Sequence, residues 1–265
     1  MSTTTIVTAP VPPSAAAARG SSLRRLTTIE LKLFLRDRNG PIVGIGFPLI
    51  LLIIFGNIPY YSRPKADLGG LTLLDVYVPI LITFVIAMLS TNTLPPVLAG
   101  YRERGILRRL RTTPAGPARV LAAQLILNLV VEVFAVVLLL VVARFAFHVV
   151  LPRQLAGFAV SAVLAAAALI AVGLFVAAAV PTAKMANAVG AILFYVMMFF
   201  AGLFLPTEDM PSALRHVSHA TPLGAAVQAL NDSAQGHWPA GLQLFTMAAY
   251  AVAFGLAAVR LFRWE

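Results

Sequence analysis

Long apolar runs, nearly free of charged side chains, are the feature that most limits how this chain can fold. The six runs occupy residues 41–59, 72–99, 119–143, 154–180, 187–205 and 241–259. An α-helix rises about 1.5 Å per residue, so about 20 apolar residues are needed to cross the roughly 30 Å hydrocarbon core of a bilayer. Each run is close to or above this length. The sequence therefore predicts an all-α polytopic membrane protein with six transmembrane helices.

The overall composition supports a membrane protein and excludes a soluble domain. Of the 265 residues, 60% are hydrophobic and 11% are charged, whereas soluble domains have roughly 45–50% apolar and about 25% charged residues. The absence of cysteine excludes disulfides, thiol catalysis and cysteine-bound zinc. The net charge of +10 would suggest nucleic-acid binding in a soluble protein. Here the charge lies in short segments between apolar runs, as in the cytoplasmic loops of membrane proteins.

The distribution of lysine and arginine predicts the orientation of the chain in the membrane. Positively charged loops resist translocation and stay in the cytoplasm. With the N-terminus inside, 15 of the 20 Lys and Arg residues lie on the cytoplasmic side. The five on the outer side are Arg63, Lys65, Arg144, Arg153 and Arg215. Six crossings then place both termini in the cytoplasm.

The first 40 residues are expected to lie outside the hydrocarbon core. Residues 1–20 are rich in Thr, Ala and Pro and are interpreted as a disordered cytoplasmic tail. Residues 21–40 carry leucines near helical spacing, with basic side chains largely on the other side. This pattern is typical of an amphipathic helix on the membrane surface. A soluble helix packed on a partner is the alternative for this segment.

Two segments between the runs are long enough to form structure of their own. On the inner side, residues 101–117 read YRERGILRRLRTTPAGP, which predicts a short basic helix with an apolar edge that Pro114 ends. On the outer side, residues 206–240 alternate polar and apolar stretches between prolines. Neither half of this outer segment is long enough to cross the membrane. It is therefore predicted to be a re-entrant helical hairpin between spans 5 and 6.

Polar side chains inside the apolar runs are candidates for function, because polar and ionisable groups are costly in hydrocarbon. Gln124, Asn128 and Glu132 recur every four residues in the third run, which places them along one helix face. They either line a translocation path for a cationic group, or hydrogen-bond to neighbouring helices and hold the bundle together. Asn92, in the stretch STNT of the second run, also needs a partner outside its own helix.

The sequence contains no catalytic or nucleotide-binding motif. The pair His216 and His219 lacks an obvious third ligand for a metal. A P-loop requires the pattern G-x-x-x-x-G-K-[ST], and none of the three lysines has that setting. We therefore expect that the chain is not an enzyme and binds no cofactor or metal, and that energy for any transport comes from another protein.

Three stretches resemble the permeases of the ATP-binding-cassette type-2 family, the membrane subunits of bacterial exporters. RERGILRRLRTTPAGPARVL (102–121) resembles the cytoplasmic loop after the second span of that family. The family motif positions are occupied by Glu103, Gly105, Leu107, Leu110 and Pro114. FFAGLFLPTEDMP with TPLGAAVQAL (199–211, 221–230) resembles the outer hairpin of the family, and the terminal RLFRWE resembles a frequent family ending. The resemblance covers residues 23–265.

The resemblance implies the arrangement of a transport complex. Residues 21–40 would be the connecting helix, residues 41–265 the permease domain, and residues 102–113 a coupling helix between spans 2 and 3. Two such chains would pair as a homodimer or a heterodimer with a close relative. Two separate ATPase subunits, which hold ATP and magnesium, would dock below. The residues expected at the ATPase contact are Arg102, Glu103, Arg104, Gly105, Leu107, Arg108, Leu110 and Arg111.

The resemblance also implies a cargo path between the paired permeases, lined mainly by spans one, two and five. The path candidates in this chain are Asn92, Asn128, Glu132, Phe194, Met197, Met198 and Phe200. Most of these side chains are apolar, which favours a hydrophobic or amphipathic small molecule such as a drug, an antibiotic or a lipid-like compound. We therefore expect an exporter of the bacterial plasma membrane, of the type found in multidrug efflux or antibiotic resistance.

A proton- or ion-coupled secondary transporter is the alternative, with Glu132 as the coupling site. Inverted repeats would favour it, but residues 41–143 and 154–259 show no convincing likeness. A membrane scaffold without a transport role is a third possibility. Transport by the reconstituted protein distinguishes these classes, since only the permease depends on an added ATPase.

Overall fold

The computed structural model describes residues 15–37, 41–65, 70–110, 116–203 and 210–261. Within these ranges the chain is helical, apart from short loops and one isolated antiparallel bridge between Pro64 and Thr72. The elements are α1 (Ala15–Arg36), η1 (Ile42–Gly46), α3 (Phe47–Asn57), α4 (Pro59–Ser62), α5 (Leu73–Met88), η3 (Leu89–Thr93), α6 (Leu94–Glu103), α7 (Ile106–Leu110), α8 (Gly116–Phe147), α9 (Leu155–Ala179), α10 (Ala183–Phe200), α11 (Ser212–Ala220), α12 (Pro222–Gln235) and α13 (Gly241–Leu261). The two η elements are π-helical turns that continue into the next α-helix.

Five helices are long and apolar enough to cross a membrane. They are Leu73–Glu103, which joins α5, η3 and α6, and then Ala118–Phe147, Leu155–Ala179, Ala183–Phe200 and Gly241–Leu261. For the described residues, the prediction of an all-α polytopic protein is confirmed. The first predicted run, 41–59, forms a shorter apolar helix, Ile42–Asn57. A sixth crossing therefore stays a prediction.

A proline ends the first apolar helix early. Pro59 begins the separate helix α4, and Ile58 before it is extended, with φ −87° and ψ 119°. A residue that precedes proline is kept out of the helical conformation by a steric clash. The 16 residues of Ile42–Asn57 rise by roughly 24 Å at about 1.5 Å per residue. This length is less than the hydrocarbon thickness of an ordinary bilayer.

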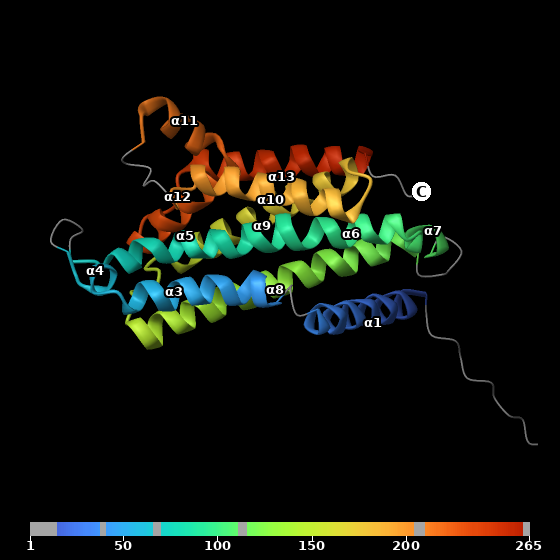
Figure 1. Ribbon diagram of the computed structural model, residues 1–265, viewed down its shortest axis with the longest axis horizontal. Helices are drawn as coiled ribbons and strands as arrows, with labels where there is room; N and C mark the ends of the chain where they lie inside the picture. Colours follow the sequence, from blue (N-terminus) through green and yellow to red (C-terminus); the bar gives the residue numbers. More distant parts are fainter. Residues whose placement is uncertain (1–14, 38–40, 66–69, 111–115, 204–209, 262–265) are drawn as a thin grey trace, which may run out of the picture.

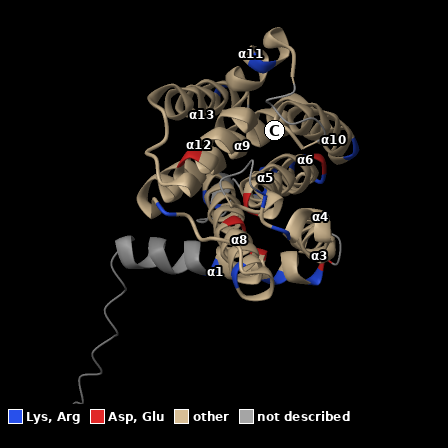
Figure 2. Cartoon of the chain, turned by 90° about the vertical axis from the view of Figure 1, so that its left-hand side faces the viewer, with Lys and Arg blue, Asp and Glu red and all other residues tan. Residues whose placement is uncertain are grey.

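The loops gather at two opposite ends of the bundle (Figure 1). α7, the loop between α9 and α10, and the last turn of α13 lie at one end, here called the α7 end. α4, α11 and the loop between α8 and α9 lie at the other, the α11 end. Figure 2, viewed from the α11 end, shows few charged positions on a largely uncharged ribbon. Successive loops thus lie at opposite ends of the bundle, as expected if successive spans run in opposite directions. Which of the two ends faces the cytoplasm stays a prediction.

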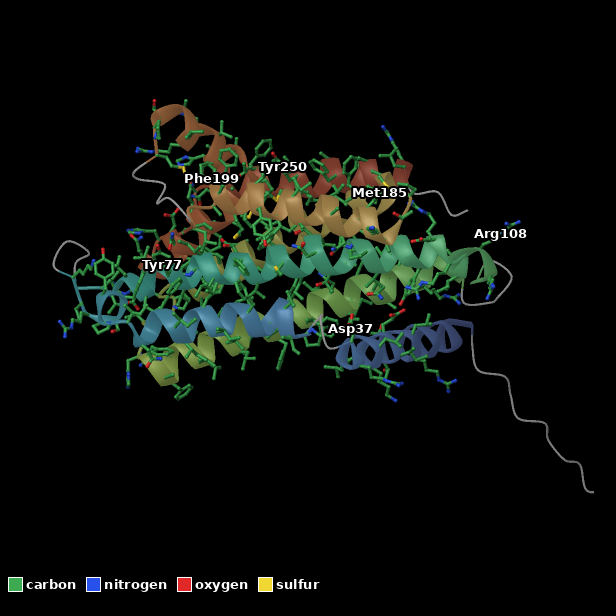
Figure 3. The ribbon with its side chains drawn as sticks, viewed as in Figure 1. Asp37, Tyr77, Arg108, Met185, Phe199 and Tyr250 are labelled. Atoms are coloured by element: carbon green, nitrogen blue, oxygen red, sulfur yellow. The ribbon has the colours of Figure 1, made fainter. Side chains whose placement is uncertain are left out.

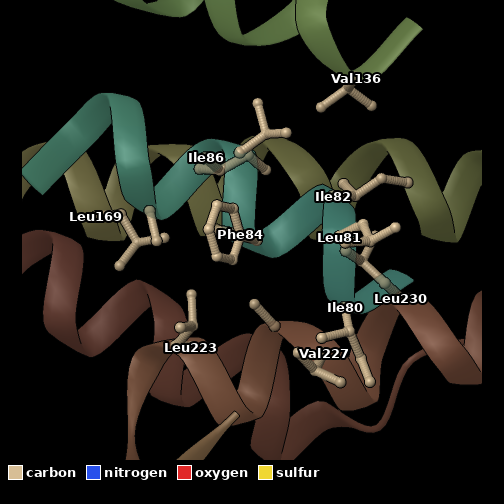
Figure 4. Close-up of a cluster of buried hydrophobic side chains, with 14 of the residues drawn as sticks. Ile80, Leu81, Ile82, Phe84, Ile86, Val136, Leu169, Leu223, Val227 and Leu230 are labelled. Carbon is tan, nitrogen blue, oxygen red and sulfur yellow. The ribbon is translucent and has the colours of Figure 1, made fainter. Parts of the chain in front are cut away.

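α5 is the central helix of the bundle. Its residues 78–87 are all buried, and α5 contacts α8, α9 and α12. Figure 4 shows Phe84 of α5 beside Leu169 of α9 and Leu223 of α12. The core of the protein therefore surrounds the second span.

The outward faces of the bundle are apolar. Phe134 on α8, Ile192 on α10 and Phe245 on α13 are exposed. Water-soluble proteins do not expose so many large apolar side chains over several helices. These faces are therefore suited to contact with lipid or with another membrane-embedded chain.

The outer segment after α10 forms two helices that meet at Thr221. α11 is mostly exposed, whereas α12 is buried against α9 and α5. The Thr221 side chain caps α12 by accepting the N–H of Gly224 at 3.1 Å. A Cβ on Gly224 would overlap with the carbonyl oxygen of Ser218 in α11, so glycine permits the tight turn. Residues 204–209 lie outside the described residues, and re-entry of this pair into the membrane stays a prediction.

The N-terminal helix is longer than the sequence predicts. α1 begins at Ala15 instead of residue 21, because the run of alanines at 15–18 has the highest intrinsic helix propensity. The helix contacts α8 and lies beside it on the α7 side (Figure 1). The remainder of the predicted tail, residues 1–14, lies outside the described residues, as do residues 38–40.

Candidate functional site

The second span contains a π-helical turn, Leu89–Thr93 (η3), here called the wide turn. Two prolines at its end, Pro95 and Pro96, have no backbone N–H and cannot donate to the carbonyl groups one helical turn earlier. The N–H of Leu94 bonds the carbonyl oxygen of Leu89, five residues before it. The turn is therefore wider than that of an α-helix, and such turns are frequent at functional sites.

Glycines let three neighbouring helices approach the wide turn. A Cβ on Gly173 of α9 would overlap with the carbonyl oxygen of Ser90, and a Cβ on Gly190 of α10 would overlap with that of Thr91. Gly44 of η1 lies against Leu89, and a Cβ there would be 2.6 Å from the Leu89 Cδ2 atom. The fourth and fifth predicted spans and the first apolar helix therefore meet the second span at one level of the bundle.

Glu132 of α8 joins the wide turn by a buried hydrogen-bond network. Its Oε1 atom accepts hydrogen bonds from the Ser90 hydroxyl at 2.6 Å and from the Asn128 amide at 2.7 Å. The side chain is 1% exposed. Within the described part of the chain, the Oε2 atom is buried and has no hydrogen-bond partner. A carboxyl group in this position links the third span to the second.

A second polar cluster connects α1 to the bundle. The Glu30 Oε2 atom accepts hydrogen bonds from the Tyr101 hydroxyl at 2.7 Å and from the Gln124 amide at 2.8 Å. Glu30 and Gln124 are both buried. Burial raises the pKa of the Glu30 carboxyl above its ordinary value, and the hydrogen bond from Tyr101 partly offsets this rise. The cluster therefore holds the carboxyl group of Glu30, on α1, against α6 and α8.

The predicted polar stripe is thus divided between two clusters. Gln124 belongs to the Glu30 cluster, and Asn128 and Glu132 belong to the wide-turn network. This geometry favours hydrogen bonding between helices over an open path as the role of the stripe. Glu30 was not among the residues predicted from the sequence, although Leu26, Glu30 and Phe34 recur every four residues, which places a carboxyl group on the apolar face of α1.

The start of the predicted coupling helix is attached to the loop between α9 and α10. The Arg102 guanidinium donates to the carbonyl oxygen of Ala178, at 3.2 Å, and to that of Val180. The Glu103 carboxylate accepts the N–H of Ala183, at 3.0 Å. A cation at a helix C-terminus and an anion at a helix N-terminus are both favourable. Arg102 and Glu103 therefore hold the end of span 2 against this loop.

The predicted coupling helix, residues 102–113, is divided by a bend. α6 ends at Glu103, and α7 begins at Ile106. Gly105 between them has φ +66°, a left-handed conformation that glycine adopts without steric cost. Beyond the bend, Leu107 is 1% exposed, whereas Arg108 is exposed.

The exposed part of this segment is basic. Figure 3 shows Arg108 at the tip of the bundle, beyond the other labelled residues. Arg104 and Arg109 are also exposed. Arg111 and Pro114 lie outside the described residues, as does the side chain of Leu110.

The path candidates lie at separate places in a single chain. Phe194 and Met198 are buried, and the Phe194 ring meets the Phe84 ring edge-on, with centroids 5.0 Å apart. Met197 and Phe200 line an apolar cavity of about 570 Å³ between α9, α10 and α13. Asn128 lines another cavity, of about 330 Å³, between α1, α6 and α8.

The other two path candidates lie at the wide turn and its network. Asn92 is half-buried and donates to the Thr91 hydroxyl at 3.3 Å. Glu132 is closed off in the network described above. Among the described residues, no three His, Asp or Glu side chains lie together as metal ligands would.

Comparison with known families gives one assignment. The sequence model of the family described as "ABC-2 type transporter" matches residues 21–234, which is most of the chain. The matched region includes most of α1, the wide turn, the Glu30 cluster, α7, α11 and all but the last residue of α12. The comparison with curated proteins finds no match.

Two substitutions of Glu132 test the hydrogen-bonding role of the network. Glu132→Gln is expected to preserve stability, because both hydrogen bonds reach Oε1 and the Gln carbonyl oxygen can accept them. Glu132→Leu leaves the buried Ser90 and Asn128 donors without this acceptor, which is expected to destabilise the protein by about 1–3 kcal/mol. Thermal unfolding of the purified variants measures the difference. Equal losses of stability in the two variants would contradict this role.

The raised pKa of Glu30 predicts that the docking of α1 depends on pH. The folded state holds the carboxyl proton more tightly than the unfolded state does, so docking is strongest below the ordinary pKa of 4.5 and weakens as the pH rises through the raised value. Amide hydrogen exchange of residues 25–36, corrected for intrinsic rates, is expected to be faster at about pH 8 than at about pH 5. The Glu30→Gln variant serves as the control and should lose this dependence; a variant that keeps it would refute the assignment to Glu30.

Proposed function

The chain belongs to the ABC-2 type transporter family, and from this membership we propose that it is the permease subunit of an ATP-binding-cassette exporter. Permeases of this family normally work with ATPase subunits. The sequence has no P-loop, so a separate chain would bind and hydrolyse the ATP. Two copies of this chain, or this chain with a close relative, would form the complete transmembrane unit.

The observation that carries the proposal is the exposed basic helix α7 at the end of span 2. Arg108 and Arg109 are exposed, whereas Leu107 is buried and fixes the helix to the bundle. A basic helix with one buried edge suits a groove with an acidic rim, because complementary charges favour docking. We place the ATPase contact at α7, which puts the α7 end of the bundle in the cytoplasm.

The contacts of α6 provide a route from α7 into the membrane. α6 continues directly into the wide turn, where the second span meets Glu132, Gly173 and Gly190. Arg102 and Glu103 join the same helix to the loop that begins α10. A displacement of α7 would therefore move span 2 together with the inner ends of spans 4 and 5. Only a partner that binds two conformations with different affinity can drive such a change, and the ATPase would supply that difference.

Pairing of two chains through α10 would bring the path candidates on this helix near those of the second chain. The exposed apolar side chains of α10 include Ile192, Tyr195 and Val196, and their faces suit a second membrane-embedded chain or lipid. The candidates Met197 and Phe200 lie on the same helix. A path lined by aromatic and thioether side chains fits a hydrophobic or amphipathic cargo. A drug, an antibiotic or a lipid-like compound, moved outward, is the cargo class that we propose.

A proton-coupled transporter remains the second candidate, and one observation favours it. The Glu132 Oε2 atom is buried without a hydrogen-bond partner among the described residues, and intramembrane carboxyl groups of this kind serve as proton sites in transporters. The Glu132→Gln variant is informative here too. A transport defect in this variant, with normal assembly, would indicate a role beyond hydrogen bonding.

Transport by the reconstituted protein tests the proposed energy source. Proteoliposomes that contain the permease and its ATPase are expected to move a hydrophobic dye only when ATP is supplied on the α7 side, because the chain has no P-loop. A proton gradient alone should drive no transport. Uptake driven by the gradient without the ATPase would refute the proposal and support the second candidate.

Charge reversal on α7 tests the docking site. Arg108→Glu is expected to weaken ATPase association by about tenfold, because a close charge contact becomes repulsive. Arg260→Glu is the matched control, since Arg260 is exposed near the end of α13 on the same side of the bundle. Affinity is measured by pull-down at two salt concentrations. Equal effects of the two variants would place the contact elsewhere.

A further inference from the structure

A cavity of about 330 Å³ lies between α1, α6 and α8, toward the α7 end. Apolar residues of its lining include Leu94, Val97, Leu127 and Val131. The lining also includes polar residues, among them Glu30, which is buried, and Asp37, the residue that follows α1 (Figure 3). The cavity therefore offers a polar site and an apolar surface next to each other.

The ionisable residues of the cavity lining favour a ligand that is positively charged. The ionisable groups that line the cavity are Glu30, Asp37, Tyr101 and Arg104, so the lining contains two carboxyl groups and one guanidinium. The described hydrogen bonds to Glu30 come from Tyr101 and Gln124, which are neutral donors. A buried carboxylate that has only neutral donors gains from a nearby cation, because a charge in low dielectric is costly unless it is paired.

The hydrogen-bonding groups of the cavity also favour a ligand that donates hydrogen bonds. The Gln124 amide nitrogen already donates to Glu30 and Tyr101, and the oxygen of an amide can accept a hydrogen bond from a ligand. The Asn128 amide nitrogen donates to Glu132. Amide and carboxyl oxygens accept hydrogen bonds, and a primary ammonium group has three donors and no acceptor. A primary ammonium matches this set better than a quaternary ammonium or an anion does.

We propose that this cavity binds an amphiphile with a primary ammonium head group, held beside Glu30 and Asp37, with its apolar chain against Leu94, Val97 and Leu127. The apolar part of the lining excludes a small hydrated cation as the preferred occupant, because such an ion gains nothing from hydrocarbon contacts. Ile29, Leu33 and Leu35 are exposed on α1, so the helix that borders the cavity suits contact with lipid. The site lies within one chain and is independent of the proposed ATP-driven export.

Photolabelling tests the site. The probe is an 18-carbon primary amine that carries a diazirine, and the matched neutral probe has a hydroxyl in place of the amine. The full chain is placed in phosphatidylcholine nanodiscs without an ATPase, so the result does not depend on the transport proposal. The amine is expected to label residues 25–36 and 120–131 saturably, and about tenfold more efficiently than the alcohol, because hydrogen bonds to charged groups are stronger than neutral ones. Equal labelling by the two probes would overturn the proposal.

Variants locate the ligand within the cavity. Glu30→Gln removes the charge but keeps an oxygen for Tyr101 and Gln124, and it is expected to lower amine labelling by about tenfold. Asp232→Asn removes a carboxyl outside the cavity but keeps an oxygen for the Gln243 amide, and should have no effect. Val97→Phe fills the apolar part of the lining, keeps the carboxyl groups and should block both probes. Labelling that persists in Glu30→Gln and Val97→Phe, with α1 still protected from hydrogen exchange, would refute the site.

The same experiment distinguishes two sources of the ligand. Phosphatidylethanolamine in the nanodisc carries a primary ammonium group and competes with the probe if the occupant is a bilayer lipid. Labelling that persists in its presence identifies a single-chain amphiphile as the preferred occupant. Both results support an ammonium site. Failure of the amine to label the wild-type protein would remove the site and leave the proposed permease function unaffected.

Discussion

Backbone carbonyl groups inside a membrane must be hydrogen-bonded or closely covered by protein, and this requirement shapes the bundle around the wide turn. The prolines at 95 and 96 interrupt the helical hydrogen bonds of the second span. Gly173 and Gly190 then allow two other spans to cover the carbonyl groups of Ser90 and Thr91. The buried carboxyl of Glu132 joins the third span at the same level. The contact point of the helices is thus set by a backbone irregularity in one of them.

The wide turn and the α7 end are connected by one short helix. α6 begins at the wide turn and ends with Arg102 and Glu103. Arg102 binds the C-terminal end of α9, and Glu103 binds the N-terminal end of α10. Each of these contacts places a charged side chain at the helix terminus that favours it. α6 is therefore held at both ends to spans 4 and 5, which makes it a rigid connection between a surface contact and the core.

Hydropathy was sufficient to predict the apolar helices, because the free energy of a span depends on its own composition. The spacing of four residues was sufficient to place Gln124, Asn128 and Glu132 on one helix face, since helical periodicity is local. The partners Ser90, Tyr101 and Glu30 could not be predicted, because they come from segments distant in sequence and meet only through packing. The bend at Gly105 was missed for a related reason, since glycine permits a left-handed turn without requiring one.

The short first helix has a consequence for the membrane around the protein. Ile42–Asn57 provides roughly 24 Å of apolar length at about 1.5 Å per residue, against a hydrocarbon thickness of about 30 Å. A helix of this length that crosses the bilayer is mismatched to it, and neighbouring lipids must thin or tilt to cover its ends. The affected lipids would lie next to α8, which contacts this helix. The protein would then thin the bilayer locally, and lipid packing there would differ from that around the longer spans.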